Sequence, residues 1–286
     1  MTKALQATLF SLLAVMANAQ GFTLFELNYT RFGNAEVPNS PLNEETSFQE
    51  LEASLNIPIR LKNDKLILVN GLRYRLVTPD VDTDIANLNL HFIGYSLQAI
   101  KPLNDKLTLI AAIVPALSSD LQDDITNDDF LFTGSAAMRK KVSEQFSYAL
   151  GIAFTSRFGE PLVLPIVQIK HQKNRFTLNA ALPSGVTALW KNKTGNLSYG
   201  FSANASGSQY HLSLPNYDVA RFTRINLGPS VEYRVKGPLV LMANAGVALR
   251  RQFEFIPEAG SNTITLDPDN TGFFNIGLAI KPQPRQ

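Results

Sequence analysis

Polar and apolar residues alternate strictly along two runs between residues 49 and 77, which a short charged turn joins. In the first run, Leu51 and Leu55 lie on one face, and Glu50 and Glu52 lie on the other. The second run repeats the pattern with leucines against arginines. This period of two is typical of β-strands with one wet face and one apolar face. The runs also reach the roughly 9–11 residues that a strand needs to cross a membrane.

The two runs predict a hairpin with a mixed-charge polar face. If the charged turn closes near its middle, Glu52 lies opposite Arg73 and Glu50 lies opposite Arg75. Opposite charges that face each other across two strands are a favourable pairing. The apolar face of the same hairpin would then contact lipid, as in a transmembrane barrel.

The same alternation recurs up to residue 280, and short charged turns alternate with longer loops rich in Asp, Asn and Pro. Transmembrane barrels have short turns on the periplasmic side and long loops outside. Both termini lie on the periplasmic side only if residues 176–190 form two strands. A break at residues 182–185 is reasonable, because Pro183 interrupts a ladder and Ser-Gly favours a turn.

We therefore predict an all-β fold, a single antiparallel up-and-down transmembrane β-barrel of about 14 strands. The alternative is 12 strands, with the short runs around Pro183 folded as an inserted hairpin. A soluble β protein is a further alternative, but its strands are usually shorter, about 5–6 residues.

The first 19 residues have the features of a secretory signal peptide in the expected order. Lys3 is followed by an apolar stretch from Leu9 to Met16 and by a small-x-small site at residues 17–19. We predict a cleaved signal peptide over residues 1–19 and one barrel domain over residues 20–286. The predicted location is the cell outer membrane.

Composition narrows the choice of partners. The 26 Lys and Arg nearly balance the 24 Asp and Glu, which argues against a nucleic-acid binder with its concentrated basic surface. The chain has no Cys, so it has no disulfide framework and no thiolate metal site. We expect no cofactor. The expected partners are outer-membrane lipid, the barrel-assembly machinery and a small solute.

The stretch from Phe176 to Leu212 has a recognisable order of motifs. A strand ends in Leu182-Pro183, Leu189-Trp190 follows, and Tyr-His-Leu closes the stretch. In this order the chain resembles an outer-membrane β-barrel family of Gram-negative bacteria catalogued as a domain of unknown function. The resemblance covers nearly all of the predicted mature chain and implies a location rather than an activity.

One feature departs from the usual pattern of outer-membrane barrels. Many of them end on an aromatic residue that helps the assembly machinery. Here residues 281–286 hold no aromatic residue, so we expect the assembly signal at Phe273 and Phe274.

Charged side chains on the predicted inward face are the candidates for lining a pore. Charged rings set ion selectivity when water fills the lumen, whereas paired charges can fill a narrow barrel. The selectivity candidates are Glu50, Glu52, Arg73, Arg75, Arg224, Glu232, Arg234 and Arg250, and Glu26, His91 and Arg139 share the predicted face. If the last long hairpin closes at Gly237, Arg224 lies opposite Arg250. We expect such a like-charge pair to mark a water-filled region that attracts anions.

Catalytic and metal-binding patterns are weak. His211 with Ser208 is the one histidine–serine arrangement near the predicted outer rim, and an ordinary polar loop explains it better. Acidic residues cluster in the loops at residues 80–84 and 120–129, where carboxylates could offer oxygens to Ca²⁺. Neither loop has EF-hand spacing, so we favour solvated acidic loops and expect no metal.

Three hypotheses for function follow from this pattern. The first is a passive porin-like channel for small solutes, and the second is a closed barrel with a surface binding or structural role. The third is a membrane-embedded lipid-modifying hydrolase that uses His211. We favour the first and predict that the protein is not an enzyme.

Overall fold

A computed structural model of the chain describes residues 22–38, 45–61, 65–81, 88–155, 162–214, 216–257 and 263–282. The predicted signal peptide over residues 1–19 lies outside the described residues.

Long strands dominate the described residues, and in most of them inward and outward side chains alternate as the period-two pattern requires. The wall strands are β1 (Phe25–Phe32), β3 (Glu45–Leu61), β4 (Leu66–Val81), β5 (Leu90–Pro102), β6 (Leu107–Ser119), β7 (Phe130–Lys141), β8 (Phe146–Thr155), β9 (Leu162–Lys173), β10 (Phe176–Leu182), β11 (Gly185–Lys191), β12 (Leu197–Leu214), β13 (Tyr217–Lys236), β14 (Leu239–Ile256) and β16 (Thr271–Ile280). The short elements are β2 (Ala35–Glu36), β15 (Ile264–Leu266) and the 3₁₀ helix η1 (Asn127–Asp129).

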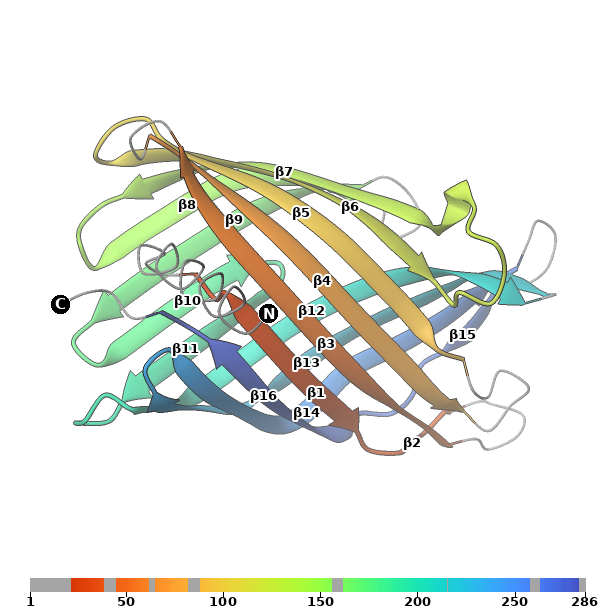
Figure 1. Cartoon of the computed structure of the whole chain (residues 1–286). Coiled ribbons are helices and arrows are strands. Elements are labelled where there is room, and N and C mark those ends of the chain that lie inside the picture. The colour runs from red at the N-terminus through yellow and green to blue at the C-terminus, as the bar shows by residue number, and fades with distance from the viewer. Residues whose placement is uncertain are drawn as a thin grey trace, which may run out of the picture.

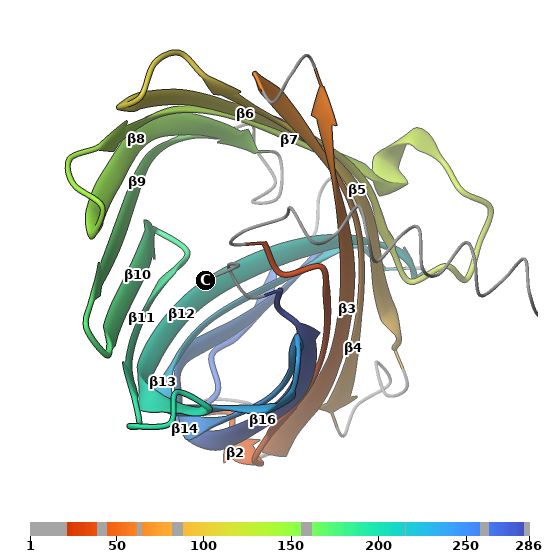
Figure 2. The same cartoon turned by 60° about the vertical axis from the view of Figure 1, so that its left-hand side comes forward.

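The strands form a closed antiparallel barrel. Each wall strand from β3 to β14 pairs with the next along the chain, β14 pairs with β16, and β1 closes the ring between β16 and β3. Figure 2 looks toward one end of this ring. The described wall strands number fourteen, which confirms the predicted fold and strand count.

A turn separates two strands near Pro183, as predicted. Ala181 pairs with Gly185 at the β10–β11 turn. Both strands belong to the wall, because β10 also pairs with β9 and β11 also pairs with β12. The alternative of 12 strands with an inserted hairpin is therefore wrong.

The two ends of the barrel differ in their connections. Phe25 pairs with Ile280, so both ends of the described chain lie at the end that carries tight turns, such as the one at residues 236–239. The opposite end carries longer connections, such as the one between Ser119 and Phe130. Because short turns are typical of the periplasmic side, we call the first end the inner end and the second the outer end.

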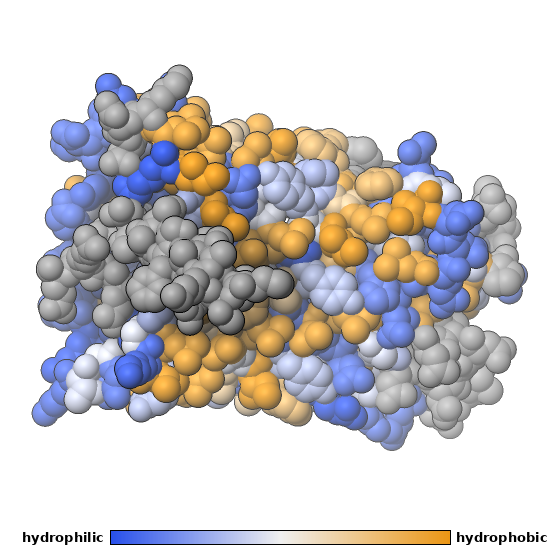
Figure 3. Space-filling view, in the orientation of Figure 1, coloured by the Kyte–Doolittle hydropathy of each residue, from blue (hydrophilic) through white to orange (hydrophobic). Residues whose placement is uncertain are grey.

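The outer wall is apolar in its middle. Many large apolar side chains are exposed there, including Leu72, Leu150, Ile152, Phe201 and Ile276, each more than half accessible. Figure 3 shows apolar residues gathered over the middle of the visible face and polar residues at both ends. Such a band is what a transmembrane barrel presents to lipid. Among the described residues, no helix has the length and hydropathy of a membrane span.

The inside of the barrel is packed at the outer end. Phe32 stacks on Phe48 with ring centroids 3.9 Å apart, Phe48 meets Phe222 edge-on at 4.5 Å, and Phe222 stacks on Phe253 at 4.4 Å. In the sheet order, β14, β16 and β1 separate β13 from β3, so the Phe48 and Phe222 rings reach toward each other through the lumen. The outer aromatic cluster comprises Phe32, Phe48, Val77, Leu88, Leu90, Phe92, Ala116, Tyr210, Leu212, Ala220, Phe222, Ala248, Phe253, Phe255 and Phe273.

A contact between β6 and β12 narrows the same end. His211 bridges to Ser119 in parallel orientation, although five strands separate β6 from β12 in the sheet order. The Asp120 amide donates to the His211 carbonyl at 3.1 Å, and both the amide and the hydroxyl of Ser213 donate to the Asp120 carboxylate. We call this the β6–β12 contact.

Candidate functional site: the barrel cavity

A cavity of about 910 Å³ lies below the outer aromatic cluster, which contributes Phe273 to its lining. Its walls differ in character. One side is polar and carries Glu26, Asn28, Thr30, Glu50, Glu52, Arg73 and Arg75 from β1, β3 and β4. Another side is largely apolar and carries Ala153, Leu164, Ile166, Ala181, Leu182 and Pro183 from β8 to the β10–β11 turn.

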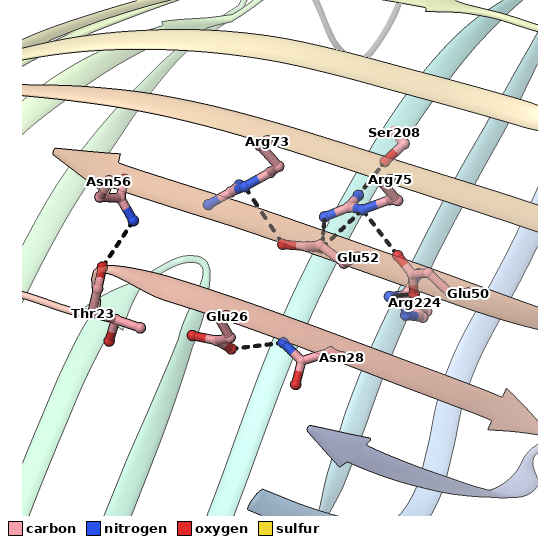
Figure 4. A network of polar contacts seen from close by, with 10 residues as sticks. All are labelled: Thr23, Glu26, Asn28, Glu50, Glu52, Asn56, Arg73, Arg75, Ser208 and Arg224. Carbon is pink, nitrogen blue, oxygen red and sulfur yellow. Dashed lines mark hydrogen bonds and ion pairs between the residues drawn. The ribbon is translucent and has the colours of Figure 1, made fainter. Parts of the chain in front are cut away.

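Strand pairing brings the charges of the polar wall together. Glu50 and Glu52 are two residues apart on β3, so both point inward, and Glu52 pairs directly with Arg75 of β4. Arg75 Nη2 lies 2.8 Å from Glu52 Oε2, and Arg75 Nε lies 3.0 Å from Glu50 Oε1. Arg224 of β13 forms an ion pair with the same Glu50 (Figure 4).

Arg75 also reaches across the lumen. Its Nη1 donates to the hydroxyl of Ser208 on β12 at 2.8 Å. Two glutamates and two arginines therefore neutralise one another at the upper boundary of the cavity, namely Glu50, Glu52, Arg75 and Arg224. A buried carboxylate and guanidinium are tolerated when they are paired and hydrogen-bonded in this way.

Two arginines of the lining are more accessible. The side chain of Arg73 is 49% exposed and lies 3.5 Å from Glu52, and Arg250 is exposed. Four arginines and three glutamates line the cavity, so its described wall carries one positive charge more than negative.

The eight sequence-predicted candidates separate into two groups. Six of them, on β3, β4, β13 and β14, line the cavity. Glu232 and Arg234 lie instead near the inner end of β13. Lys281 Nζ contacts Glu232 at 2.8 Å, and Arg234 donates to the carbonyls of Gly237 and Lys281, each at 3.0 Å.

The predicted hairpin register is wrong by two residues. Glu52 pairs with Arg75 rather than Arg73, and Glu50 pairs with Val77 rather than Arg75. The reason is that the ladder continues to Leu61 and Leu66, so the turn closes later than its charge pattern suggests. Charge pairing survives the shift because Arg75 and Arg73 are long enough to reach carboxylates diagonally across the strands.

A bulge disrupts the predicted pairing of Arg224 with Arg250. Ile225 pairs with Leu249 and Thr223 pairs with Gln252, so two residues of β14, Arg250 and Arg251, lie opposite Arg224. Arg250 adopts a left-handed conformation with φ 48° at this bulge. Arg224 contacts Glu50 instead, so no like-charge pair forms there.

His211 and Ser208 do not form a catalytic pair. The two residues are three apart on β12 and so lie on opposite faces of the strand. Ser208 points inward to Arg75, whereas His211 Nδ1 lies 3.0 Å from Asp129 Oδ1 of η1. Burial alone would raise the pKa of Asp129, but hydrogen bonds from Ser119, Thr126 and His211 lower it below its ordinary value.

His91 and the acidic loops are the remaining candidates from the sequence. His91 lies on the outward face of β5, where Tyr74 OH is 3.0 Å from its Nδ1, so its predicted inward position is wrong. In the 120–129 loop, Asp120 and Asp129 accept hydrogen bonds from Ser213 and Thr126. No group of metal-ligating residues occurs among the described residues, and much of the 80–84 loop lies outside them.

Sequence reasoning missed Arg251. Its side chain is fully buried beside the outer aromatic cluster, with the guanidinium 5.9 Å from the Phe48 ring and Nη2 donating to the Asp269 carbonyl at 2.8 Å. The bulge at Arg250 turns this residue inward, and a one-residue bulge leaves no clear mark in an alternation pattern.

The fold and the cavity define a closed membrane-type β-barrel with a charged interior cavity of about 910 Å³. The chain matches the family described as a domain of unknown function (DUF6268) over residues 15–281 and belongs to that family. No curated protein sequence matches it.

Several solved outer-membrane proteins are similar to this chain at low sequence identity. An outer-membrane channel from Pseudomonas putida F1 is 10% identical with a TM-score of 0.46, covering 92% of this chain and 97% of that one. The Pseudomonas putida toluene transporter TodX is 10% identical with a TM-score of 0.44, covering 96% and 93%. The NanC porin is 6% identical with a TM-score of 0.41, covering 90% and 99%.

Proposed function

We propose that the protein is a porin-like channel of the cell outer membrane that passes small solutes. The observation that carries this proposal is the cavity of about 910 Å³ inside a closed barrel with a lipid-facing apolar band. The volume is within the range of small-molecule sites, about 300–1,000 Å³.

The inner half of the lumen supports the same conclusion. Lys170 points inward from β9 and is exposed, and Arg139 and Gln168 on the same inward face are partly accessible. Side chains that point inward and still reach solvent indicate a lumen that is not packed at this level. Solutes would therefore reach the cavity from the inner end.

The surplus positive charge of the lining suggests a preference for anions. Arg73 and Arg250 are exposed at the cavity wall, whereas Arg75 and Arg224 are neutralised by Glu50 and Glu52. Charged side chains at a pore wall set ion selectivity when water fills the pore. Arg73 and Arg250 would therefore set selectivity, and the neutral network would hold the wall in shape.

Export by the signal peptide at residues 1–19, insertion by the barrel-assembly machinery and contact with outer-membrane lipid are part of this proposal. Phe273 and Phe274 lie on β16, the last wall strand, where an assembly signal would be placed.

A closed barrel with a structural or surface-binding role is the second candidate. The outer aromatic cluster favours it, because packed rings close the lumen at the outer end. A hydrolase that uses His211 has less support, since Ser208 faces away from it.

Single-channel recording separates the first two candidates. The full-length protein, extracted in detergent, is added to a planar bilayer under a KCl gradient. Stable ohmic steps with a reversal potential on the anion-selective side are expected. A folded, inserted barrel without conductance would contradict the channel and support the closed barrel.

A further inference from the structure

On the side of β1, β3 and β13, the outer aromatic cluster leaves the cavity no straight route to the outer end. Phe273 belongs both to the cavity lining and to the outer aromatic cluster, so the cluster forms the cavity roof. Phe48, Phe222 and Phe253 in that cluster are at most 2% exposed. A solute that enters from the inner end therefore needs a different exit.

Among the described residues, strand pairing is interrupted along one edge of β12. On the inner side, β11 pairs with this edge as far as Asn204, and the Ala205 amide donates to the Ser184 carbonyl at 2.9 Å. Toward the outer end, the Gln209 carbonyl next accepts a hydrogen bond from the Ser118 hydroxyl at 2.5 Å.

Between these two contacts, no described strand pairs with this edge at residues 206–208. We call this stretch the β12 gap. At about 3.3 Å per residue, the four steps from Ala205 to Gln209 span about 13 Å.

Backbone geometry shows that the β12 gap is polar. Alternate residues of an antiparallel strand turn their N–H and C=O groups to the same edge. Ala205 and His211 use this edge, so Gly207 faces it too. Unpaired backbone at membrane depth is tolerated where it lines a water-filled space. Ser206 and Gly207 do line the cavity, so the gap and the cavity are continuous.

The opposite rim is apolar on its outer surface, and its cavity side combines two threonines with a leucine. Thr133, Thr155 and Leu164 line the cavity on this side. Their outward neighbours Phe132 and Val163 are 44% and 61% exposed and belong to the apolar band. A molecule crossing the rim would pass from lipid-facing side chains to the apolar wall of the cavity.

The β12 gap lies at the outer boundary of the apolar band. Ile225, which pairs with Ala205, is 38% exposed on the lipid face. Four residues further out along β12, the outward pair of Gln209 and Arg221 is polar, and Arg221 Nε donates to Gln209 Oε1 at 3.1 Å. This change from apolar to polar places the gap at the headgroup level of the outer leaflet.

We propose that the cavity takes small amphipathic molecules with an anionic head and exchanges them with the outer leaflet through the β12 gap. This inference rests on the proposed channel function and specifies its solute and its exit. Arg73 and Arg250 meet the anionic head, and Leu164, Ile166 and Leu182 meet the apolar tail.

The exit is tested by tryptophan quenching in vesicles with lipids brominated close to the headgroup. Trp190, the single native tryptophan, is first replaced in a Trp190→Phe background. Ser206→Trp then reports on the gap. Asn204→Trp is the matched control, because Asn204 also lines the cavity but pairs with Gly185 of β11.

Brominated lipid is expected to quench the tryptophan fluorescence of Ser206→Trp as strongly as that of an outward Ala203→Trp. The fluorescence of Asn204→Trp is expected to stay unquenched. Equal brightness of Ser206→Trp and Asn204→Trp would overturn the lateral exit. If Ser206→Trp does not assemble, Ser206→Cys labelled with a small fluorophore reports on the same position, because the chain has no other cysteine. The quenching result does not depend on ion conductance. It therefore distinguishes a barrel that conducts no ions from a barrel whose β12 gap excludes lipid.

The solute class is tested with the Asn204→Trp reporter. Decanoate, an anion with an alkyl tail, is expected to change its fluorescence with saturation, whereas acetate gives no saturable change. The double variant Arg73→Gln and Arg250→Gln is expected to lose the decanoate response. A missing decanoate response, or equal responses to the two anions, would overturn the amphipathic solute even if the gap admits lipid.

Discussion

Arg75 and Ser208 are hydrogen-bonded at 2.8 Å across the lumen, although 133 residues separate them in the chain. The contact ties β4 to β12 directly below the outer aromatic cluster. Because Arg75 also contacts Glu50 and Glu52, one guanidinium joins two walls of the barrel. This network fixes the upper boundary of the cavity.

Glu50→Gln is expected to destabilise the barrel strongly. Glu50 is 3% exposed and pairs with Arg75 and Arg224, so its loss leaves two guanidinium groups without this anion. Removing one partner of a buried ion pair typically costs about 3–5 kcal/mol. The free energy of unfolding is measured by urea titration in vesicles.

Glu254→Gln is the control for this measurement. Glu254 lies 3.6 Å from Arg221 with both side chains 29% exposed, and such a pair typically contributes about 0–1 kcal/mol. Equal losses for the two variants would show that the buried network adds no stability of its own.

Phe48→Ala is expected to open the outer end. The Phe48 ring contacts Phe32, Phe222 and Phe253, so its loss leaves a hole in the middle of the cluster. The expected loss of stability is about 3–5 kcal/mol, and single-channel conductance should rise. Phe201→Ala, on the exposed lipid face, is the control and should leave conductance unchanged. Unchanged conductance in a folded Phe48→Ala would mean that the cluster does not limit flow.

The strands and their number could be predicted because their signals are local. Alternation marks each strand, and Pro183 with Ser-Gly marks the break between β10 and β11. The register of the first hairpin was harder to predict from the sequence. It depends on how far the ladder continues into the turn, to Leu61 and Leu66, and a shift of two residues keeps every side chain on its own face.

The packed outer end could not be predicted from alternation. The pattern assigns Phe48 and Phe222 to the inward face, but it does not say whether that face meets water or other rings. The bulge at Arg250 adds a further difficulty, since it changes which residues of β14 point inward and so buries Phe253. Inward aromatic residues near the outer ends of several strands are the signal that would have indicated a plug.

The double variant Arg73→Glu and Arg250→Glu is expected to shift ion selectivity toward cations. Both arginines are accessible at the cavity wall, so reversing them changes the local charge without removing a buried pair. The measurement is the reversal potential under a KCl gradient. Arg234→Glu is the control, because Arg234 lies near the inner end and outside the cavity lining. An equally large shift of the reversal potential for Arg234→Glu would show that the cavity arginines do not set ion selectivity.

The β6–β12 contact is expected to loosen in acid. Hydrogen bonds lower the pKa of Asp129 below its ordinary value of 3.8, so its charged form stabilises the folded contact. This contribution is fully present above pH 3.8 and is lost as the pH falls through the lower folded-state value. The Thr126 amide donates to Asp129 Oδ2 at 2.7 Å, so its hydrogen-exchange protection reports on the carboxylate.

Protection at Thr126 should therefore fall at low pH while amides of the central strands stay protected. Asp129→Asn should show weak protection that does not change with pH over the same range, because the titrating group is gone. Protection of Thr126 that stays constant to the lowest pH at which the barrel remains folded would contradict this role of Asp129. The β6–β12 contact would then depend on the Asp120–Ser213 hydrogen bonds and the backbone bridge at His211.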